Sequence, residues 1–458
     1  MRPSKKEGSD GEVGRVPPYW SWTTQPEQLC FQGQIPPADV AIIGGGLTGL
    51  SAAYHLLKRY PGTRIVVLEA NRLGAGASGR STGMLSPGVG QSVASLVRRL
   101  GVTHARRLYE QTIEAVNYAA ALIDQLGIDC ELRMSGQLII GRSSVGKRRV
   151  RQQLELLRLL GLPAEELSEQ ALSNVIRLQD SSAKVCATED PAALRLPNAG
   201  VLHPLKLVHG FASRIRELAG QIFEQAHVRC VHPPTRPGHP VRLELDGGEV
   251  LADKVVVATS GYTSQLGLFR GRLLPVHLQA LVTEPLNEAA LLAIGWAGCE
   301  GVLDARRLFS YFRLTSDKRV LFGGGRPRYS WGGALDELPS QSTLTLLADE
   351  LKQTFPIDSQ LVVAGGWSGT IGYVLDALPA IAALPSCPQI VHAVGWCGHG
   401  IALSIASGSW IQKLLFDGVP PEDLPWFRAT MPMVPTELAR WIGFRASIEW
   451  MALLDRMS

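Results

Sequence analysis

Three glycines with the spacing Gly-x-Gly-x-x-Gly are the first residues in this sequence whose types and positions indicate a particular chemistry. Gly44, Gly46 and Gly49 follow the apolar run ADVAII, which is typical of a buried strand, and lead into LSAAYHLLKRY, which is typical of a helix. Glycines at these positions allow a tight turn, a close approach of a pyrophosphate and close helix packing. Backbone N–H groups at the start of the helix then face the phosphates with a partial positive charge. The segment therefore predicts a dinucleotide site.

An acid at the end of the next apolar run completes this unit. The helix stops at Pro61-Gly62, and the strand-like run RIVVLEA follows, with Glu69 near its end. A carboxylate in this position can accept a hydrogen bond from a ribose hydroxyl. An NAD unit would continue with further strands and helices, whereas here NRLGAGASGRSTGMLSPGVG follows at once. This second segment, rich in Gly, Ser and Arg, can lie along a longer cofactor.

The glycine pattern and the segment GASGRSTG resemble the superfamily of FAD enzymes that includes D-amino-acid oxidase, glycine oxidase and sarcosine oxidase. The most similar pattern is that of the γ-glutamylputrescine oxidase-like branch, which has GASGRNGG. Ser81 and Thr82 replace its Asn and Gly beside the flavin, so the resemblance does not carry a substrate over. It covers about residues 38–418, and it implies an FAD-dependent oxidoreductase.

The resemblance implies FAD contacts in three separate blocks. Glu69 would bind the adenosine ribose, Val228 would reach the adenine through its backbone, and the helix start at Gly398 would face the pyrimidine end of the flavin. Arg80 would lie along the cofactor, with an ordinary solvated loop arginine as the alternative. The expected FAD-binding residues are Gly44, Gly46, Leu47, Thr48, Gly49, Glu69, Ala70, Arg72, Ala77, Ser78, Arg80, Ser81, Thr82, Gly83, Met84, Val228, Ala258, Thr259, Gly261, Gly395, Gly398, His399, Gly400 and Ile401.

The same blocks set the expected fold, an α/β (α+β) chain of two domains. One is a Rossmann-like FAD-binding domain built from three discontinuous segments, and the other is a substrate domain with a mixed sheet backed by helices. The expected boundaries are 1–37 for a partly flexible N-terminal extension, 38–97, 198–265 and 361–418 for the FAD-binding domain, 98–197 and 266–360 for the substrate domain, and 419–458 for a C-terminal helical extension.

Substrate contacts are expected from the segment LFSYFRLT. In this superfamily the flavin takes a hydride from a C–H group next to nitrogen or oxygen, so the protein mainly positions the substrate. Alternation with period two places Phe309, Tyr311 and Arg313 on one face of a strand. Arg313 could pair with a substrate carboxylate and Tyr311 could shape the pocket; the alternative is an edge strand with an ordinary surface arginine. Arg326 and Tyr329 are weaker candidates in a loop.

His399 is the third candidate catalytic residue, as a general base, although its place within the motif GHG matches a cofactor contact at a helix start. His203 and His209 have no acidic or Cys partners at metal-ligand spacing, so they are expected to be structural and no metal site is predicted. Cys397 is expected to be a small buried residue rather than a nucleophile.

Departures from the superfamily narrow the expected chemistry. Glycine oxidase-like members carry an arginine before their Asp-x-x-Pro motif to hold an amino-acid carboxylate, but GTIGYVLDALP supplies no cation there. Monomeric sarcosine oxidase attaches FAD through a cysteine near this point, and none is present, so noncovalent FAD is expected. A larger amine becomes more plausible than a small α-amino acid. Ala402 replaces a family lysine and Lys318 lies in the turn-like TSDKR, which favours a carrier over oxygen as electron acceptor.

Three functions are compatible with these residues. The first is oxidation of a C–N bond in an amine or N-substituted amino acid by hydride transfer to flavin, giving an imine that hydrolyses, with electrons passed to oxygen or a carrier. The second is a hydroxy-acid or polyol dehydrogenase of the same fold. The third is an RNA-modifying or non-catalytic flavoprotein.

Composition restricts the partners and the compartment. The 458 residues are 45% hydrophobic with a formal net charge of +4, and Lys and Arg are scattered among acids, so no nucleic-acid partner is expected. Seven cysteines without a Cys-x-x-Cys pair indicate a reducing compartment, and the polar N-terminus lacks a secretory signal, so a cytoplasmic protein is expected. ELARWIGFRASIEWMALLDRM is expected to dock as a helix that closes the FAD domain, with contact to a membrane or partner as the alternative.

Overall fold

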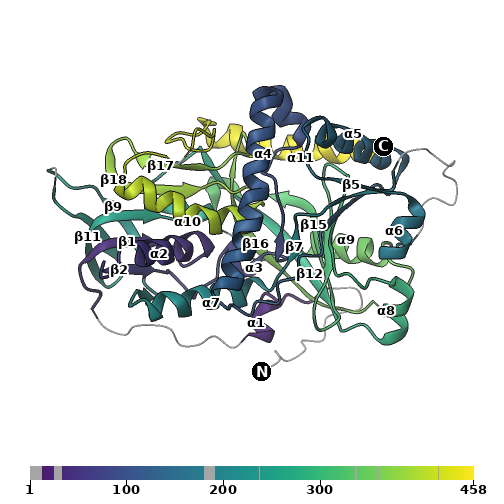
Figure 1. Cartoon of the computed structure of the whole chain (residues 1–458), viewed down its shortest axis with the longest axis horizontal. Coiled ribbons are helices and arrows are strands. Elements are labelled where there is room, and N and C mark those ends of the chain that lie inside the picture. The colour runs from purple at the N-terminus through teal and green to yellow at the C-terminus, as the bar shows by residue number, and fades with distance from the viewer. Residues whose placement is uncertain are drawn as a thin grey trace.

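The computed structural model describes residues 13–24, 34–179, 191–236, 238–335, 338–357, 361–420 and 422–457 of the chain. Two large sheets lie side by side in this part of the molecule, and helices cover each of them (Figure 1). This is the two-domain α/β architecture that the sequence predicts. Cys30 and Cys186 lie outside the described residues, and the other five cysteines are free thiols.

The first sheet is built around strand β1, whose apolar run is buried on both faces. β1 (Ala38–Ile43) pairs in parallel with β2 (Ile65–Leu68) on one side and with β11 (Gly248–Val257) on the other. The sheet order is β17-β18-β11-β1-β2-β8; β10 pairs antiparallel with β11, and β9 pairs antiparallel with β10. A strand covered on both faces reads as a continuous apolar run, as ADVAII does. The other strands are β8 (Gln221–Phe223), β9 (Val228–His232), β10 (Val241–Leu245), β17 (Ala380–Leu384) and β18 (Cys387–Val394).

Helices pack on this sheet and share an extended apolar core with it. Helices α2 and α10 pack closely against each other. Gly408 of α10 allows this contact, because a Cβ there would lie only 2.3 Å from the Ser51 hydroxyl of α2. Helix α10 is apolar almost all round, which explains why it is almost wholly buried. The helices of this core are α2 (Leu47–Arg59), α4 (Val93–Gln125), α7 (Pro204–Glu217) and α10 (Gly400–Phe416).

The second sheet has the order β16-β12-β15-β14-β13-β4-β6-β5 and is mixed, because β4 and β13 are parallel while its other pairs are antiparallel. Helix α9 packs on β12 and β15. The mixed sheet backed by helices is thus confirmed. Its strands are β4 (Gln137–Ile140), β5 (Glu165–Leu167), β6 (Ala193–Leu196), β12 (Leu273–Thr283), β13 (Gly301–Asp304), β14 (Tyr311–Leu314), β15 (Val320–Arg328) and β16 (Val363–Val374), and the helices of this half are α5 (Ser144–Leu159), α6 (Glu169–Val175), α8 (Glu288–Ile294) and α9 (Gln341–Lys352).

Short elements complete the chain. β3 (Met84–Leu85) pairs with β7 (Gly200–Val201). The remaining short elements are α1 (Trp20–Thr23), α3 (Ala77–Arg80), and the 3₁₀ turns η1 (Ser260–Leu266) and η2 (Trp331–Gly333).

Two elements lie on the other side of the expected domain boundaries. β16 falls within 361–418, yet it belongs to the second sheet, because it pairs with β12 along nearly its whole length. α4 falls mostly within 98–197, yet most of its buried apolar side chains pack with the helices of the first sheet, while Val93 and Tyr109 pack with α5. Periodicity identifies both elements, but it cannot show which sheet each of them packs against.

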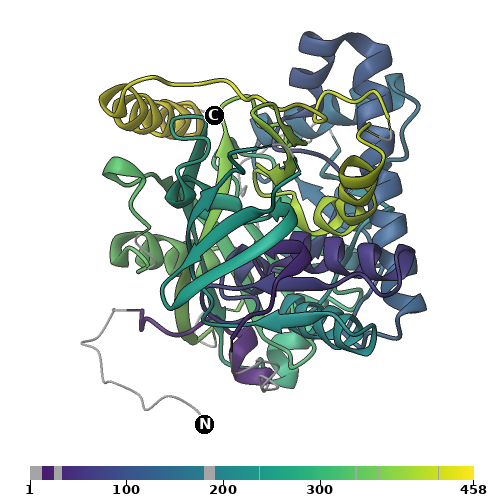
Figure 2. The same ribbon diagram turned by 90° about the vertical axis from the view of Figure 1, so that its left-hand side faces the viewer.

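The C-terminal helix α11 (Glu437–Arg456) does not close the first sheet as expected. It lies against β15 and η2, at the end of a long connection from α10 (Figure 2). Ile448 is the one buried residue among its described side chains. None of the helices that the structure describes is both long enough and apolar enough to cross a membrane.

Candidate functional site

A cavity of about 1580 Å³ opens between the two sheets and is lined by both of them. A typical small-molecule pocket has roughly 300–1,000 Å³, so this cavity has room for a large cofactor with a substrate beside it. Most of the predicted cofactor residues line it. They are Gly44, Gly46, Leu47, Thr48, Glu69, Ala70, Arg72, Ala77, Ser78, Arg80, Ser81, Thr82, Met84, Val228, Ala258, Thr259, Gly398, His399, Gly400 and Ile401.

Four predicted cofactor residues, Gly49, Gly83, Gly261 and Gly395, lie behind the cavity lining. Two of them allow backbone segments to meet. A Cβ at Gly49 would lie 2.0 Å from the carbonyl oxygen of Gly44, and a Cβ at Gly83 would lie 2.1 Å from a neighbouring backbone oxygen. These glycines therefore shape the site by close packing.

The carboxylate of Glu69 is held in place at the end of β2. The Gly45 N–H donates to Oε2 at 2.8 Å, and the Asn71 N–H donates to Oε1 at 2.9 Å. Burial raises the pKa of this carboxyl, and the two N–H donors oppose part of the rise. Glu69 and Val228 both line the cavity, and the role of Glu69 as a ribose ligand stays a prediction.

Two helices begin at the cavity. Gly46 is the N-cap residue of α2, and the first helical N–H, that of Leu47, donates to the Ser78 hydroxyl at 3.0 Å. His399 is the N-cap residue of α10, and its side chain makes no cap hydrogen bond. The N–H groups at a helix start favour anionic groups. Two buried polar atoms at the cavity, Ser81 Oγ and His399 Nδ1, have no hydrogen-bond partner among the described residues. This donor set fits the pyrophosphate and the polar ring edge of FAD.

The backbone of residues 80–83, which we name the flavin segment, is bound by side chains from three other elements. The Trp367 indole in β16 donates to the carbonyl of Arg80 at 3.0 Å. The Trp20 indole in α1 donates to the carbonyl of Ser81 at 2.7 Å. Arg313 in β14 donates to the next two carbonyls at 3.4 and 3.3 Å. The segment is therefore anchored from the side of the second sheet.

Arg313 lies away from the cavity lining, contrary to the prediction of a substrate-binding cation. Its side chain also donates to the Leu202 carbonyl at 2.7 Å, and the residue is only 3% exposed. Burial lowers the pKa of its guanidinium to about 10. The alternation of the strand does place Tyr311 and Phe309 at the cavity, but Arg313 lies farther along, where it binds backbone carbonyls.

Tyr311 lines the cavity with its ring 6.0 Å from that of Phe309, measured between centroids. Gly323 faces Tyr311 in the strand register, and a Cβ there would lie 2.4 Å from the tyrosine ring. Burial raises the pKa of Tyr311 to about 12, so its hydroxyl stays protonated at neutral pH and can donate a hydrogen bond. This placement agrees with a pocket-shaping role, which stays a prediction.

His399 stands at the cavity with its ring beside Gly88, whose added Cβ would lie 3.5 Å from the imidazole Cδ2. Burial lowers the pKa of the imidazole, so the ring is neutral at neutral pH. A neutral imidazole can accept a proton from a substrate or make a hydrogen bond to a cofactor. Both predicted roles therefore stay open.

Arg80 is not the solvated loop arginine of the alternative interpretation. Its Nε donates to the Ala75 carbonyl at 2.5 Å, and its guanidinium also donates to the Ser368 carbonyl at 2.9 Å. Cys397 lines the cavity as a thiol, because burial raises its pKa to about 12. It is therefore a small, mostly protonated group rather than a nucleophile.

The remaining candidates have structural contacts. His203 caps α7 by accepting from the Lys206 N–H at 3.2 Å. Arg326 and Tyr329 bind side chains of α11. Within the described ranges, no group of three or more His, Cys, Asp and Glu side chains could hold a metal ion.

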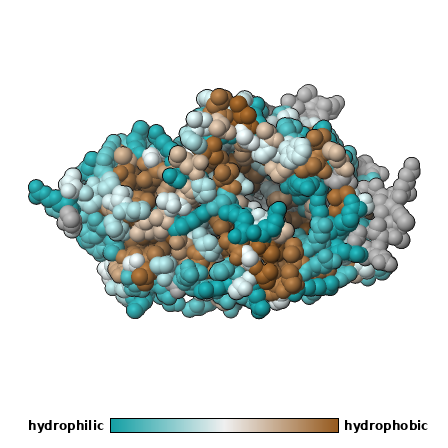
Figure 3. Space-filling model, turned by 90° about the horizontal axis from the view of Figure 1, so that it is seen from above, coloured by the Kyte–Doolittle hydropathy of each residue, from teal (hydrophilic) through white to brown (hydrophobic). Residues whose placement is uncertain are grey.

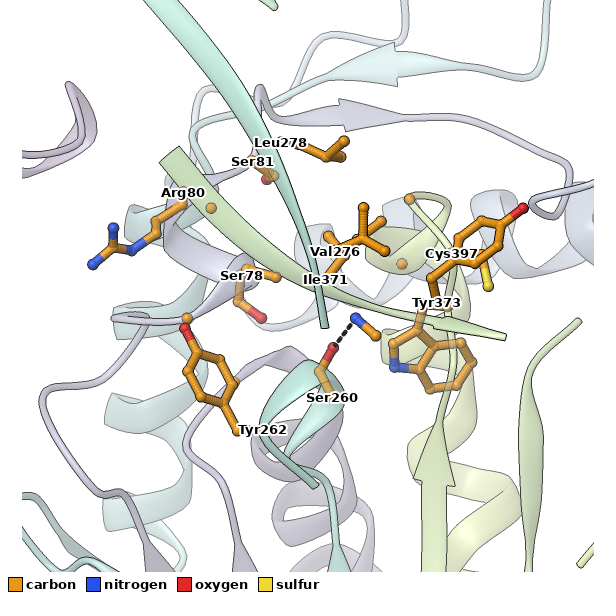
Figure 4. Close-up of a pocket in the computed structure, with 18 of the residues that line it drawn as sticks. Ser78, Arg80, Ser81, Ser260, Tyr262, Val276, Leu278, Ile371, Tyr373 and Cys397 are labelled. Atoms are coloured by element: carbon orange, nitrogen blue, oxygen red, sulfur yellow. Dashed lines mark hydrogen bonds between the residues drawn. The ribbon is translucent and has the colours of Figure 1, made fainter. Parts of the chain in front are cut away.

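Sequence reasoning missed an apolar wall on the second sheet. Leu274 and Val276 of β12 pair with Tyr373 and Ile371 of β16, and these four side chains line the cavity together with Leu278. Figure 4 shows Val276, Leu278, Ile371 and Tyr373 at this cavity. Alternation in LLPVHLQAL and GTIGYV assigns these positions to common strand faces. It cannot show that the faces meet at a cavity, because that depends on how the two sheets pack.

The comparisons with known proteins agree with this geometry. The family model described as DAO, FAD dependent oxidoreductase, matches residues 39–414. The chain is 30% identical over 380 residues to gamma-glutamylputrescine oxidoreductase of Escherichia coli (strain K12), covering 82% of this chain and 83% of the relative. It is 27% identical over 451 residues to a probable oxidoreductase OrdL of Rhizobium meliloti (strain 1021), covering 96% and 98%. Among solved structures, glycine oxidase from Geobacillus kaustophilus has a similar fold, with a TM-score of 0.71 at 21% identity over 87% of this chain and 100% of that one.

Proposed function

Because this chain belongs to the DAO family of FAD-dependent oxidoreductases, we propose that it oxidises a C–N bond of an amine or N-substituted amino acid to an imine. The chain is an enzyme whose cofactor is FAD. The observation that carries the proposal is the single cavity that joins the predicted FAD contacts to the apolar wall of the second sheet. A relative that is 30% identical is named for an amine, gamma-glutamylputrescine, which supports the C–N bond as the target.

The residues of the chain have separate tasks in this proposal. Bound FAD supplies the acceptor for a hydride from the carbon next to nitrogen. Gly46, the α2 N-terminus and Glu69 hold the adenosine and pyrophosphate part, while the flavin segment and the α10 N-terminus contact the ring. The apolar wall excludes water and positions the reacting carbon. The protonated Tyr311 hydroxyl donates a hydrogen bond to the substrate.

The two sheets divide these tasks between two domains. The first sheet, with α2, α4, α7 and α10, would form the FAD-binding domain. The second sheet, with β16 and helices α5, α6, α8 and α9, would form the substrate domain. Compared with the expected boundaries, only β16 and α4 change domain. The substrate carbon that reacts would lie where the two domains meet.

Anaerobic mixing of the purified, FAD-loaded protein with small molecules tests the proposed reaction. Amines or N-substituted amino acids should remove the visible absorbance of the flavin, because they reduce it. Bleaching by hydroxy acids or polyols, without bleaching by amines, would replace the proposal with the dehydrogenase alternative. If no amine, hydroxy acid or polyol bleaches the flavin, the proposed reaction is wrong.

A further inference from the structure

Helix α11 contributes a second apolar surface to the cavity. Phe444, Ser447, Ile448 and Met451 recur at three- and four-residue spacing, and all four line the cavity. Phe444 packs in one apolar cluster with Val276 of the opposing sheet. Residues 437–456 lie outside the 39–414 segment that matches the family model. We name the space between α11 and the apolar wall the substrate chamber.

Hydrogen bonds at both ends hold α11 over the chamber. Near its N-terminus, the Glu437 carboxylate accepts from the Gly332 N–H at 2.7 Å. Near its C-terminus, the Asp455 carboxylate accepts from the Leu308 N–H at 2.9 Å. The side of the helix that faces away from the cavity is open to solvent, and Trp450 there is 61% exposed. Apolar patches are visible when the molecule is seen from above (Figure 3). Between the two ends, Arg326 donates to the Glu449 carboxylate at 2.6 Å.

Charged groups are unevenly distributed along the cavity. The lining acids among the described residues are Glu69 and Asp246, and both belong to the first sheet and its turns. The substrate chamber instead has two lining arginines, Arg307 and Arg440. Arg440 is bound to the Glu437 carboxylate at 2.8 and 3.0 Å and to a backbone carbonyl at 2.5 Å. The guanidinium of Arg440 is therefore occupied by hydrogen bonds to protein groups.

Arg307 differs because its guanidinium makes no hydrogen bond to the residues that the structure describes. It forms a long ion pair with Asp455, in which Nη1 lies 3.8 Å from Oδ1. That carboxylate already accepts from the Arg149 guanidinium at 3.0 Å and from the Arg307 backbone N–H at 3.1 Å. The Arg307 side chain is 42% exposed, so it stands at the cavity with donors left for a ligand.

We propose that the substrate carries a large apolar group, best an aromatic one, between α11 and the apolar wall, and an anionic group that pairs with Arg307. This inference rests on the proposed amine oxidation and specifies its substrate class. An aromatic group would bury its surface against Phe444, Ile448 and Tyr373. A second ammonium group, as in a diamine, is disfavoured, because no described acid lines the chamber to compensate for its burial.

Calorimetric titration of the FAD-loaded protein with unreactive probes tests the chamber without turnover. The probe 4-phenylbutyrate has both an aromatic ring and a carboxylate, butyrate lacks the ring, and 4-phenylbutanamide lacks the charge. We expect 4-phenylbutyrate to bind about tenfold more tightly than either of the other two. Equal or tighter binding of butyrate or of the amide would overturn the inference.

Two variants with matched controls assign each contact. Arg307→Gln should weaken 4-phenylbutyrate about tenfold and leave the amide unchanged, because only the ion pair is lost. Phe444→Ala should weaken both phenyl compounds by the same factor. The controls are Arg326→Gln, which removes an ion pair to Glu449 of α11, and Trp450→Ala, which removes an exposed aromatic ring of the same helix. If the controls lower affinity as much as the chamber variants, binding depends only on the docking of α11 and the inference fails.

The turnover assay separates this inference from the proposed reaction. If the aryl anion binds as expected but no amine bleaches the flavin, the chamber is supported and amine oxidation is overturned. If short hydrophilic amines or diamines bleach the flavin faster than amines with an aryl and a carboxylate group, amine oxidation holds and the inference is overturned.

Discussion

At the scale of single residues, the site depends on positions where the backbone leaves no room for a side chain. Gly44 has a φ of +110°, and a Cβ there would lie 2.6 Å from the Ala258 carbonyl oxygen. Gly46 faces Ser78, and a Cβ added at Gly46 would lie 2.9 Å from the Ser78 Oγ. The first glycine motif therefore serves both the turn and the space in front of α2.

Replacement of Gly46 by Val should give protein without bound FAD. The added side chain would occupy the space in front of the α2 N-terminus that the pyrophosphate requires. Visible flavin absorbance per mole of purified protein measures this occupancy. Gly247→Val is the control, because a Cβ at that turn meets no atom within 4 Å. Full flavin occupancy in Gly46→Val would show that the phosphates bind elsewhere.

His392 should make the protein less stable in acid. It is 0% exposed, and burial lowers its pKa to about 4 from an ordinary 6.5, although an interaction with the Arg428 backbone opposes part of this shift. Between pH 6.5 and 4 the unfolded chain binds a proton that the folded chain does not, so stability rises with pH through this window and is complete above it. The contribution is on the order of 3 kcal/mol.

Urea unfolding at several pH values checks this prediction through His392→Phe. The variant keeps a ring of similar size beside Phe269, whose centroid is 4.7 Å from that of His392, and it has no proton to bind. The free energy of unfolding should therefore fall less steeply between pH 6.5 and 4 than in the natural protein. Identical slopes would show that His392 does not carry the acid sensitivity.

At the scale of elements, α1, β14 and β16 hold the flavin segment in one conformation. Each donates to a different carbonyl of residues 80–83, so the segment presents Ser81 and Thr82 to the cavity. A segment fixed before the cofactor binds loses less conformational entropy on binding. Trp20 therefore supports a segment that is predicted to contact FAD, although 61 residues separate Trp20 from Ser81.

Trp20→Phe should weaken FAD binding about fivefold, which corresponds to the loss of one hydrogen bond of about 1 kcal/mol. The ring and its packing stay, while the donor to the Ser81 carbonyl is lost. Fluorescence of released FAD on dilution measures the change. Trp22→Phe is the matched control, because the Trp22 indole nitrogen has no partner among the described residues. Equal effects of the two substitutions would contradict the anchoring role.

At the scale of the whole molecule, the electron acceptor should be a carrier rather than oxygen. Among the described residues that line the cavity there is no lysine, and Lys318 lies in a turn with a φ of +64°. We therefore expect slow recovery of the flavin absorbance after reduction when air-saturated buffer is added in a stopped-flow mixer. Rapid recovery with stoichiometric peroxide would show that Arg80 or the α10 N-terminus supplies enough positive potential.

Acid precipitation of the whole protein should release FAD into the supernatant. Cys397 is the cysteine at the cavity among the described residues, and burial keeps it a thiol that donates to the Gly395 carbonyl at 3.1 Å. A flavin that stays with the pellet would show a covalent link. Mass spectrometry of the pellet would then locate it.

Local features of this protein can be read from its sequence. The turn at Gly44, the helix after it and the acid Glu69 are set by neighbouring residues, because phosphate binding at a helix N-terminus needs only one strand, one turn and one helix. The resemblance also allowed the FAD blocks to be placed along the chain. Alternation in LFSYFRLT correctly placed Tyr311 and Phe309 together.

How the two sheets meet, and therefore what lines the substrate side of the cavity, depends on contacts across the whole fold. Arg313 looked like a ligand cation because periodicity assigns it to a face without showing where the cavity ends along that face. The sequence-based boundaries place β16 in the FAD-binding domain and predict that α11 closes it. Both predictions fail because an apolar pattern does not show which surface the element covers. The apolar wall, the chamber under α11 and Arg307 arise from contacts between segments far apart in sequence, since side-chain packing between elements depends on the whole fold.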